Sequence, residues 1–266
     1  MGDVCSLTRK NKKGKCLNPT ELVTLAKKIK NPPQKITKKN ARAALNRAYP
    51  TCKRRESCFA EELHEFDLKK NAFAPFMPNS WKANPVEWLS SDEITNYMND
   101  LQRANKKFVF IGPSPQDFDA EDGNNCVWPE LCRFNLAKSK PKIGIIFNLD
   151  NHNQPGSHWV AMFIHKKHKT IFYFDSTGEA IPAGIARFRD KVLKQSNNTY
   201  TFHENHPVEH QQGDTECGMY VLNFVLDMAQ GAGSVNYFNT HFKNNRAVIS
   251  DDSMQHSRSK MFGSST

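Results

Sequence analysis

The sequence contains no apolar run long enough to cross a membrane, which requires about 18 or more consecutive apolar residues. It opens with a polar and basic stretch instead of the apolar core of a secretory signal peptide. We therefore expect a soluble protein that is not secreted and has no membrane partner.

Closely spaced cysteine pairs of the Cys-x2-Cys type are absent, and the total of 7 cysteines is odd. A disulfide framework or a structural zinc site normally shows tighter, paired spacing. We therefore expect free thiols in a reducing environment, with no metal and no cofactor. The spacing also disfavours zinc binding by the four N-terminal cysteines, Cys5, Cys16, Cys52 and Cys58.

Acidic residues are scarce at the start of the chain. Residues 1–70 contain 18 Lys and Arg against 7 Asp and Glu, a net charge of +11, whereas the remainder is nearly neutral. Short helices are predicted near 22–29, 41–48 and 61–68, and a Pro/Asn-rich linker follows. We expect a basic, mainly helical arm domain with its linker over residues 1–82, and a core domain over residues 83–266.

Two interpretations of the basic arm remain open. A charge run often does no more than solvate one face of a protein. Alternatively, residues 1–70 bind DNA without sequence specificity, or bind an acidic capsid protein, through their Lys and Arg side chains.

A polar loop over residues 211–216 leads into Cys217, and a mostly apolar segment follows as far as Gly231. Its length predicts a buried helix that begins near Cys217, with Asp214 or Thr215 as the N-cap. A thiol in the first turn of a helix faces unpaired N–H groups and the positive end of the dipole, which favour the nucleophilic thiolate. The alternative is an ordinary buried cysteine of the core.

Two further residues have the chemistry of partners for this thiol. Strands are predicted over 143–149, 158–164 and 171–174, and a hairpin of the last two would place His158 beside Asp175. An imidazole oriented by a carboxylate can activate a thiol, and the amide of Gln211 can help to hold an oxyanion. Each residue alone has an ordinary structural interpretation, but their joint order favours catalysis.

The predicted elements give a fold class. Helices are expected near 90–101 and 185–194, a strand near 199–202, and loop over 112–142. This order predicts an α+β or mixed α/β fold with a mixed β-sheet packed by helices. A metal hydrolase that uses His203, His206 and His210 is disfavoured, because Pro207 breaks the helical spacing such ligands need.

The motifs resemble those of the clan CE cysteine proteases, which include SUMO-processing proteases and the adenovirus maturation protease. Within that clan, the likeness is greatest to the polyprotein-processing proteases of African swine fever virus and related large DNA viruses. The swine fever virus branch carries Asn at the position of Asp175, where this chain is closer to the cellular branch. The likeness is densest over residues 143–225 and rests on these segments: His158-Trp159, Tyr173-Phe174-Asp175-Ser176, Gln211-x5-Cys217-Gly218 and, with one residue inserted, Trp88-Leu89 before Asp92-Glu93-Ile94.

The resemblance implies a clan CE protease core and a cysteine endopeptidase that cleaves after Gly-Gly in viral structural polyproteins during virion maturation. It implies action at assembly sites in the host cytoplasm and in the virion. Two alternatives stay open: an isopeptidase that removes SUMO or another ubiquitin-like protein, and a non-catalytic basic scaffold that binds nucleic acid. The implied roles are Cys217 as nucleophile, His158 as general base, Asp175 as orienting residue, Gln211 as oxyanion donor, and Trp88 and Trp159 as walls of a narrow substrate slot.

Overall fold

The computed structural model of the protein describes residues 3–9, 14–123, 125–231, 233–244 and 249–263. The chain forms two compact units, Met1–Ala83 together with Ser259–Thr266, and Asn84–Arg258. We predicted from the sequence that the core domain spans residues 83–266. In the structure, the chain from Ser259 onward groups with the N-terminal unit. No helix of the described residues is long and apolar enough to cross a lipid bilayer.

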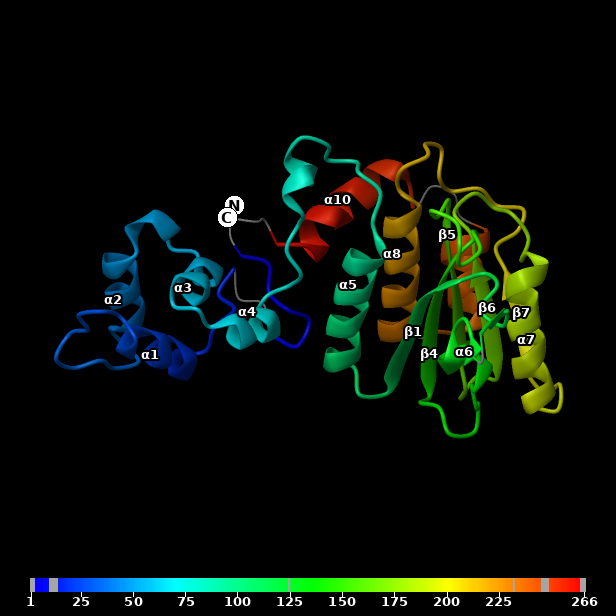
Figure 1. Ribbon diagram of the computed structural model, residues 1–266, viewed down its shortest axis with the longest axis horizontal. Helices are drawn as coiled ribbons and strands as arrows, with labels where there is room; N and C mark the ends of the chain where they lie inside the picture. Colours follow the sequence, from blue (N-terminus) through cyan, green and yellow to red (C-terminus); the bar gives the residue numbers. More distant parts are fainter. Residues whose placement is uncertain (1–2, 10–13, 124, 232, 245–248, 264–266) are drawn as a thin grey trace. The chain divides into compact units, whose positions relative to one another are not determined.

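The first unit is a small helical arm (Figure 1). Asn18 caps its first helix by accepting the backbone N–H groups of Thr20 and Glu21, and Pro19 begins the helix. The prediction of one helix near 61–68 is wrong. His64 lies there in a left-handed conformation (φ 56°) and separates two shorter helices. The elements are α1 (Pro19–Lys27), α2 (Ala41–Ala48), η1 (Pro50–Cys52), α3 (Glu56–Glu62), α4 (Phe66–Ala72) and η2 (Asn79–Lys82).

Six of the seven cysteines are paired, so the expectation of free thiols is wrong for all except Cys217. The expectation of a reducing environment rested on those thiols and loses its basis. The absence of Cys-x2-Cys spacing carried no information about partners that a turn or the tertiary fold brings together. The pairs are Cys5–Cys16, Cys52–Cys58 and Cys126–Cys132, with Cα–Cα distances of 5.2, 5.4 and 6.7 Å.

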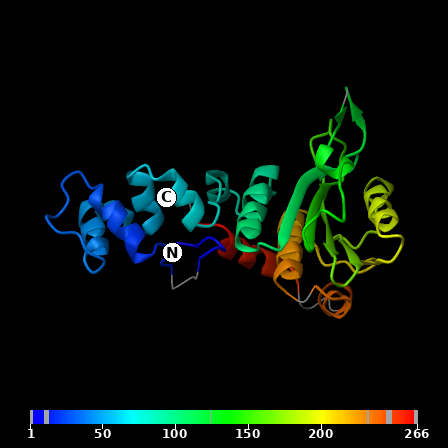
Figure 2. The same ribbon diagram turned by 90° about the horizontal axis from the view of Figure 1, so that it is seen from below.

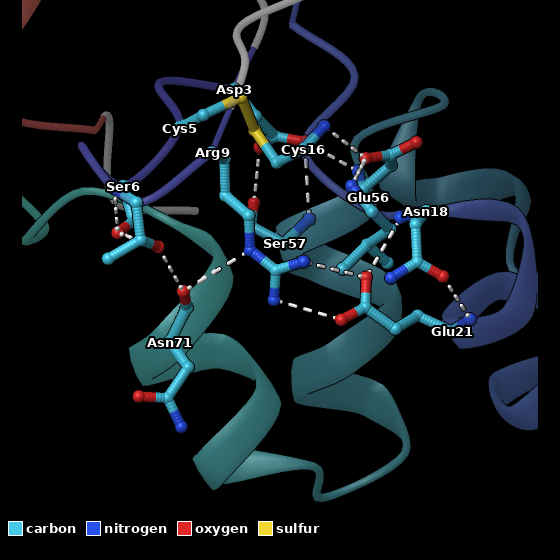
Figure 3. The surroundings of a disulfide bond; sticks show 12 residues. Asp3, Cys5, Ser6, Arg9, Cys16, Asn18, Glu21, Glu56, Ser57 and Asn71 are labelled. Carbon is cyan, nitrogen blue, oxygen red and sulfur yellow. Dashed lines mark hydrogen bonds and ion pairs between the residues drawn. A yellow bond between two sulfur atoms is a disulfide. The ribbon is translucent and has the colours of Figure 1, made fainter. Parts of the chain in front are cut away.

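Carboxylates fasten the N-terminal segment to the start of α3 beside the first disulfide (Figure 3). The buried side chain of Glu56 accepts the N–H groups of Cys16 and Leu17 at 2.6 and 2.7 Å and pairs with Arg42. In return, Asp3 Oδ2 accepts the backbone N–H of Glu56 at 2.6 Å. Disulfides and buried charge-assisted bonds thus stabilise this unit in addition to its cluster of buried apolar residues.

The second unit is built on a mixed five-stranded sheet, which confirms the predicted fold class. Its order is β1-β4-β5-β6-β7, in which the two outer pairs are parallel and the two inner pairs antiparallel. The prediction of loop over 112–142 missed the end of β1, where Pro113 and Pro115 obscure the strand signal, and also the short elements over 121–122, 125–126 and 129–132. The strands are β1 (Phe108–Pro115), β4 (Lys142–Asn148), β5 (Trp159–His165), β6 (Thr170–Phe174) and β7 (Thr201–Glu204), and β2 (Glu121–Asp122) pairs separately with β3 (Asn125–Cys126).

Helices cover both faces of this sheet. Figure 2 shows α5 (Ser91–Ala104) and α8 (Cys217–Gln230) on one face and α7 (Ala183–Gln195) on the other. Every residue of β5 is buried between these layers. Gly144 on β4 permits the close approach of α8, because a Cβ there would lie 2.7 Å from a methyl group of Val225. The remaining elements are α6 (Pro129–Cys132), α9 (Val235–Phe238), η3 (Asn239–Lys243) and α10 (Asp251–Met261).

Candidate active site

The hairpin of β5 and β6 brings His158 and Asp175 together. The strands pair antiparallel with Ala161 opposite Phe174, so the residues just before β5 and just after β6 lie at the same end of the hairpin. His158 Nε2 lies 2.7 Å from Asp175 Oδ1. The contact that strand pairing predicted is therefore present.

The Asp175 carboxylate is fixed from several directions. Only 1% of this residue is exposed, and its Oδ1 also accepts the N–H and the hydroxyl of Thr177 at 2.9 and 2.8 Å. Asn205 holds the Asp175 backbone through one bond in each direction, at 2.9 and 2.7 Å. Sequence reasoning missed both residues; the Asp-x-Thr spacing is a turn signal that could have indicated Thr177, but Asn205 has no local signal.

Cys217 is the first residue of α8, as predicted, and is 2% exposed. The prediction of Asp214 or Thr215 as the N-cap is wrong. The helix begins at Cys217, so Glu216 is the N-cap. Glu216 makes no side-chain capping bond. The N–H groups of the first turn are thus not consumed by a cap, which leaves them suited to receive a substrate oxygen.

His158 contacts Cys217 as well as Asp175, and these contacts set its charge. Burial alone would lower the pKa of the imidazole, but hydrogen bonds and charge interactions with Asp175 and Cys217 raise that pKa to about 9. Since Nε2 is engaged by the carboxylate, Nδ1 is the nitrogen left for the thiol. At neutral pH this arrangement favours the charged imidazolium form of His158 beside Cys217.

Gln211 lies in the loop before Cys217 and is 3% exposed. Its Oε1 accepts the hydroxyl proton of Ser176 at 2.8 Å, and its Nε2 donates to the carbonyl oxygen of Gly213 at 2.8 Å. The bond to Gly213 uses one of the two amide hydrogens. Ser176 was not predicted to orient Gln211, although it follows Asp175 directly.

Leu89 anchors a segment that presents Trp88 to solvent. The Trp159 indole donates to the Leu89 carbonyl oxygen at 2.9 Å. Helix α8 packs against the same residue through Gly218, where a Cβ would lie only 2.8 Å from Leu89 Cβ. Trp88 itself is 45% exposed, and within the described segments only Phe66 is another large hydrophobic residue with such exposure.

A cavity of about 650 Å³ lies beside His158, since both of its chain neighbours, Ser157 and Trp159, line it. Trp88 also lines this cavity. The structure therefore brings the two predicted substrate-binding tryptophans to one cavity. Trp159, however, is 8% exposed and uses its indole N–H to hold Leu89, which gives it a supporting position.

The histidines that were weighed as metal ligands have separate hydrogen-bond partners. His203 contacts Thr201, His206 contacts the Gly178 carbonyl oxygen, and His210 contacts the Phe242 carbonyl oxygen. Cys52, Cys58 and Glu62 lie close enough together to resemble a metal-binding cluster, but both sulfurs are joined in a disulfide.

Comparison with known proteins gives consistent matches. A family model described as the C-terminal catalytic domain of the Ulp1 protease family matches residues 82–264. A thiol protease of Acanthamoeba polyphaga mimivirus is 33% identical over 156 residues, 55% of this chain and 49% of the relative. A cysteine protease of African swine fever virus is 32% identical over 124 residues, 45% of this chain and 43% of the relative. The chain thus matches about half the length of these relatives.

The fold has a solved counterpart. The crystal structure of an African swine fever virus protease superposes with a TM-score of 0.66 and 21% sequence identity. The match covers 97% of this chain and 95% of that one. At this identity the similarity is one of fold.

Proposed function

Because this chain belongs to the Ulp1 protease family and is therefore a cysteine protease, we propose that it hydrolyses the peptide bond that follows Gly-Gly in protein substrates. The observation that carries the proposal is the position of His158 between the Asp175 carboxylate and the Cys217 thiol. The proposed roles are Cys217 as nucleophile, His158 as general base and acid, Asp175 as orienting residue and Gln211 as oxyanion donor.

The geometry supports a two-step acyl transfer. His158 holds the thiol proton, and the Cys217 thiolate attacks the carbonyl carbon of the scissile bond. The resulting oxyanion is held by the Cys217 N–H and the Gln211 amide, a contribution of about 3–4 kcal/mol per donor. His158 then protonates the amine, which departs, and the acyl part of the substrate stays bound to Cys217 as a thioester. Water attacks this thioester with His158 as base, which releases the carboxylate product and restores the thiol.

The substrate slot accounts for the Gly-Gly preference. Trp88 and Trp159 line the cavity beside His158, and glycine has no Cβ to meet these walls. We expect replacement of either glycine in a Gly-Gly-X peptide by alanine to lower kcat/KM by about 10- to 100-fold. Trp88→Ala should also lower kcat/KM, whereas Phe66→Ala, at the other exposed large hydrophobic residue, should not.

These peptides can be assayed by mass spectrometry with wild-type protein and both variants. Cleavage of a Leu-Leu-X peptide at the rate of the Gly-Gly-X peptide would contradict the slot. So would equal losses in the Trp88 and Phe66 variants.

The substrates we propose are viral structural polyproteins, cut during virion maturation at assembly sites in the host cytoplasm and in the virion. Support comes from the relatives in mimivirus and African swine fever virus. The second candidate is removal of SUMO or a related protein, since relatives from other swine fever virus isolates are named SUMO-1 cysteine proteases. Incubation with a Gly-Gly-containing polyprotein and with a SUMO isopeptide conjugate distinguishes the two by which one is cleaved.

The arm offers a second binding function. The connection between α1 and α2 carries four exposed lysines, Lys30, Lys35, Lys38 and Lys39, and none of them forms an ion pair with a described residue. Neighbouring cations differ, since Lys28 pairs with Glu65 and Arg42 with Glu56. We propose that this connection binds DNA phosphates without sequence specificity.

Replacing these four arm lysines with glutamine should weaken binding of the whole chain to random duplex DNA. The slope of log affinity against log salt should fall in magnitude by about 2 to 4, because each phosphate contact releases condensed counterions. The matched control replaces four exposed lysines of the second unit, Lys106, Lys107, Lys138 and Lys140. Equal effects of the two sets, or no binding at low salt, would contradict a DNA-binding arm, and an acidic protein partner would then be sought.

A further inference from the structure

Both carbonyl groups that flank Trp88 accept a hydrogen bond from a buried donor. The Leu89 carbonyl oxygen accepts the Trp159 indole N–H at 2.9 Å. The Glu87 carbonyl oxygen accepts Arg258 Nη1 at 2.7 Å. The backbone on each side of Trp88 is therefore fixed while its ring remains exposed, so Trp88 has a defined place beside the cavity.

Arg258 also reaches the residue that precedes the nucleophile. Its Nη2 lies 3.3 Å from Glu216 Oε2, and the two side chains are 5% and 2% exposed. Glu216 is the N-cap of α8, directly before Cys217. A single guanidinium thus joins the start of the nucleophile helix to the segment that carries Trp88.

The helix that carries Arg258 is itself fixed to the loop before the nucleophile. Asp251, the first residue of α10, accepts the N–H groups of Gly213 and Gln212 on Oδ2 at 2.8 and 3.1 Å. Its Oδ1 accepts the hydroxyl proton of Tyr220, a buried residue of α8, at 2.9 Å. These bonds hold α10 against the loop and so set the position from which Arg258 reaches across.

The ion pair of Arg258 and Glu216 contributes little net stability to the fold, because both charges are removed from water. Burial raises the pKa of Glu216 even though Arg258 acts to lower it, so the carboxylate charge is desolvated. A buried ion pair is often no more stabilising than apolar side chains of the same size. Its geometry has a use that apolar residues lack, because a planar guanidinium can donate to two acceptors in fixed directions and a lysine cannot.

We propose that Arg258 is a positioning residue that fixes Trp88 relative to Cys217 and thereby sets the width of the substrate slot. The proposal rests on the function given above only in taking Trp88 as a wall of that slot. Its structural content, that Arg258 immobilises the backbone around Trp88, can be measured without any substrate.

The test combines hydrogen exchange with kinetics on the whole chain. Two variants are used: Arg258→Lys, which keeps a charge beside Glu216, and Arg258→Met with Glu216→Gln, which leaves no unpaired buried charge. Both should raise exchange rates over residues 86–91 by about threefold or more, with strand β6 unchanged. Both should lower kcat/KM for a Gly-Gly-X peptide by about 10- to 100-fold. The alkylation rate of Cys217 should stay within about twofold of wild type.

The matched control is Arg187→Met, which removes a two-pronged ion pair with Asp119 at the surface of the same unit. It should leave the exchange and the kinetics unchanged. Unaltered exchange over residues 86–91 in both Arg258 variants would overturn the proposal, as would an alkylation rate that falls in parallel with kcat/KM. If wild type cleaves no Gly-Gly peptide, the proposed function fails, while the exchange result still decides the role of Arg258.

Discussion

Replacing Cys217 with alanine should abolish peptide cleavage and leave the fold intact. The variant has no nucleophile, and no other described cysteine is free to replace it, because the other six form disulfides. The rate should fall by about 10⁴-fold or more, the scale on which members of such catalytic units act. The change removes a single buried sulfur, so the expected loss of stability is only about 1 kcal/mol.

Peptide cleavage and circular dichroism measure the two halves of this prediction. Without reductant, iodoacetamide should add one label per chain, at Cys217, and the alanine variant should take none. A variant that still cleaves, or labels spread over the other cysteines, would contradict the assignment of the nucleophile.

Loss of the His158 imidazole should be more harmful than a change at Asp175. His158→Ala removes proton transfer, which contributes about 10²- to 10⁴-fold. Asp175→Asn keeps a group of the same shape near His158 Nε2 and in reach of Thr177, so part of the orienting role survives. The opposite order in kcat/KM would contradict these roles.

The pH dependence of kcat/KM provides the second readout for these variants. The pKa of His158 is raised from its ordinary value of 6.5 to about 9. The imidazolium is therefore present below that pH, and activity should fall as the pH rises through about 9. The stabilising effect of the charged ring should be complete below pH 6.5 and be lost over the same rise. Asp175→Asn removes a negative partner, so its alkaline limb should move to lower pH; an unmoved limb would contradict the assignment.

The features that the sequence predicted correctly depend on short-range patterns. His158 and Asp175 meet because they flank a hairpin whose strands show a clear apolar pattern, and Cys217 begins a helix whose length and composition are unambiguous. Such signals are contained within a few residues of the site. These local patterns predict the elements even where the register of the paired strands is unknown.

Two of the features that were missed depend on contacts between distant segments. Arg258 reaches Glu87 across 171 positions of sequence, and Asn205 reaches Asp175 across 30. No periodicity or spacing records such pairs. The disulfide of Cys5 and Cys16 was missed because sequence spacing alone does not show how the backbone is placed. The backbone at Cys5 forms a β-bridge with Phe73, and Cys16 lies close enough to pair with Cys5.

The most direct test of a cysteine protease with a Gly-Gly slot uses a peptide that ends in Gly-Gly followed by a vinyl sulfone, to which a thiolate adds irreversibly. Intact-mass and tandem mass spectrometry of the whole chain should show one adduct, on Cys217. The adduct should form slowly in the His158→Ala variant and slowly with an Ala-Ala counterpart of the probe. No adduct on Cys217, or equal rates with the Gly-Gly and Ala-Ala probes, would contradict the account.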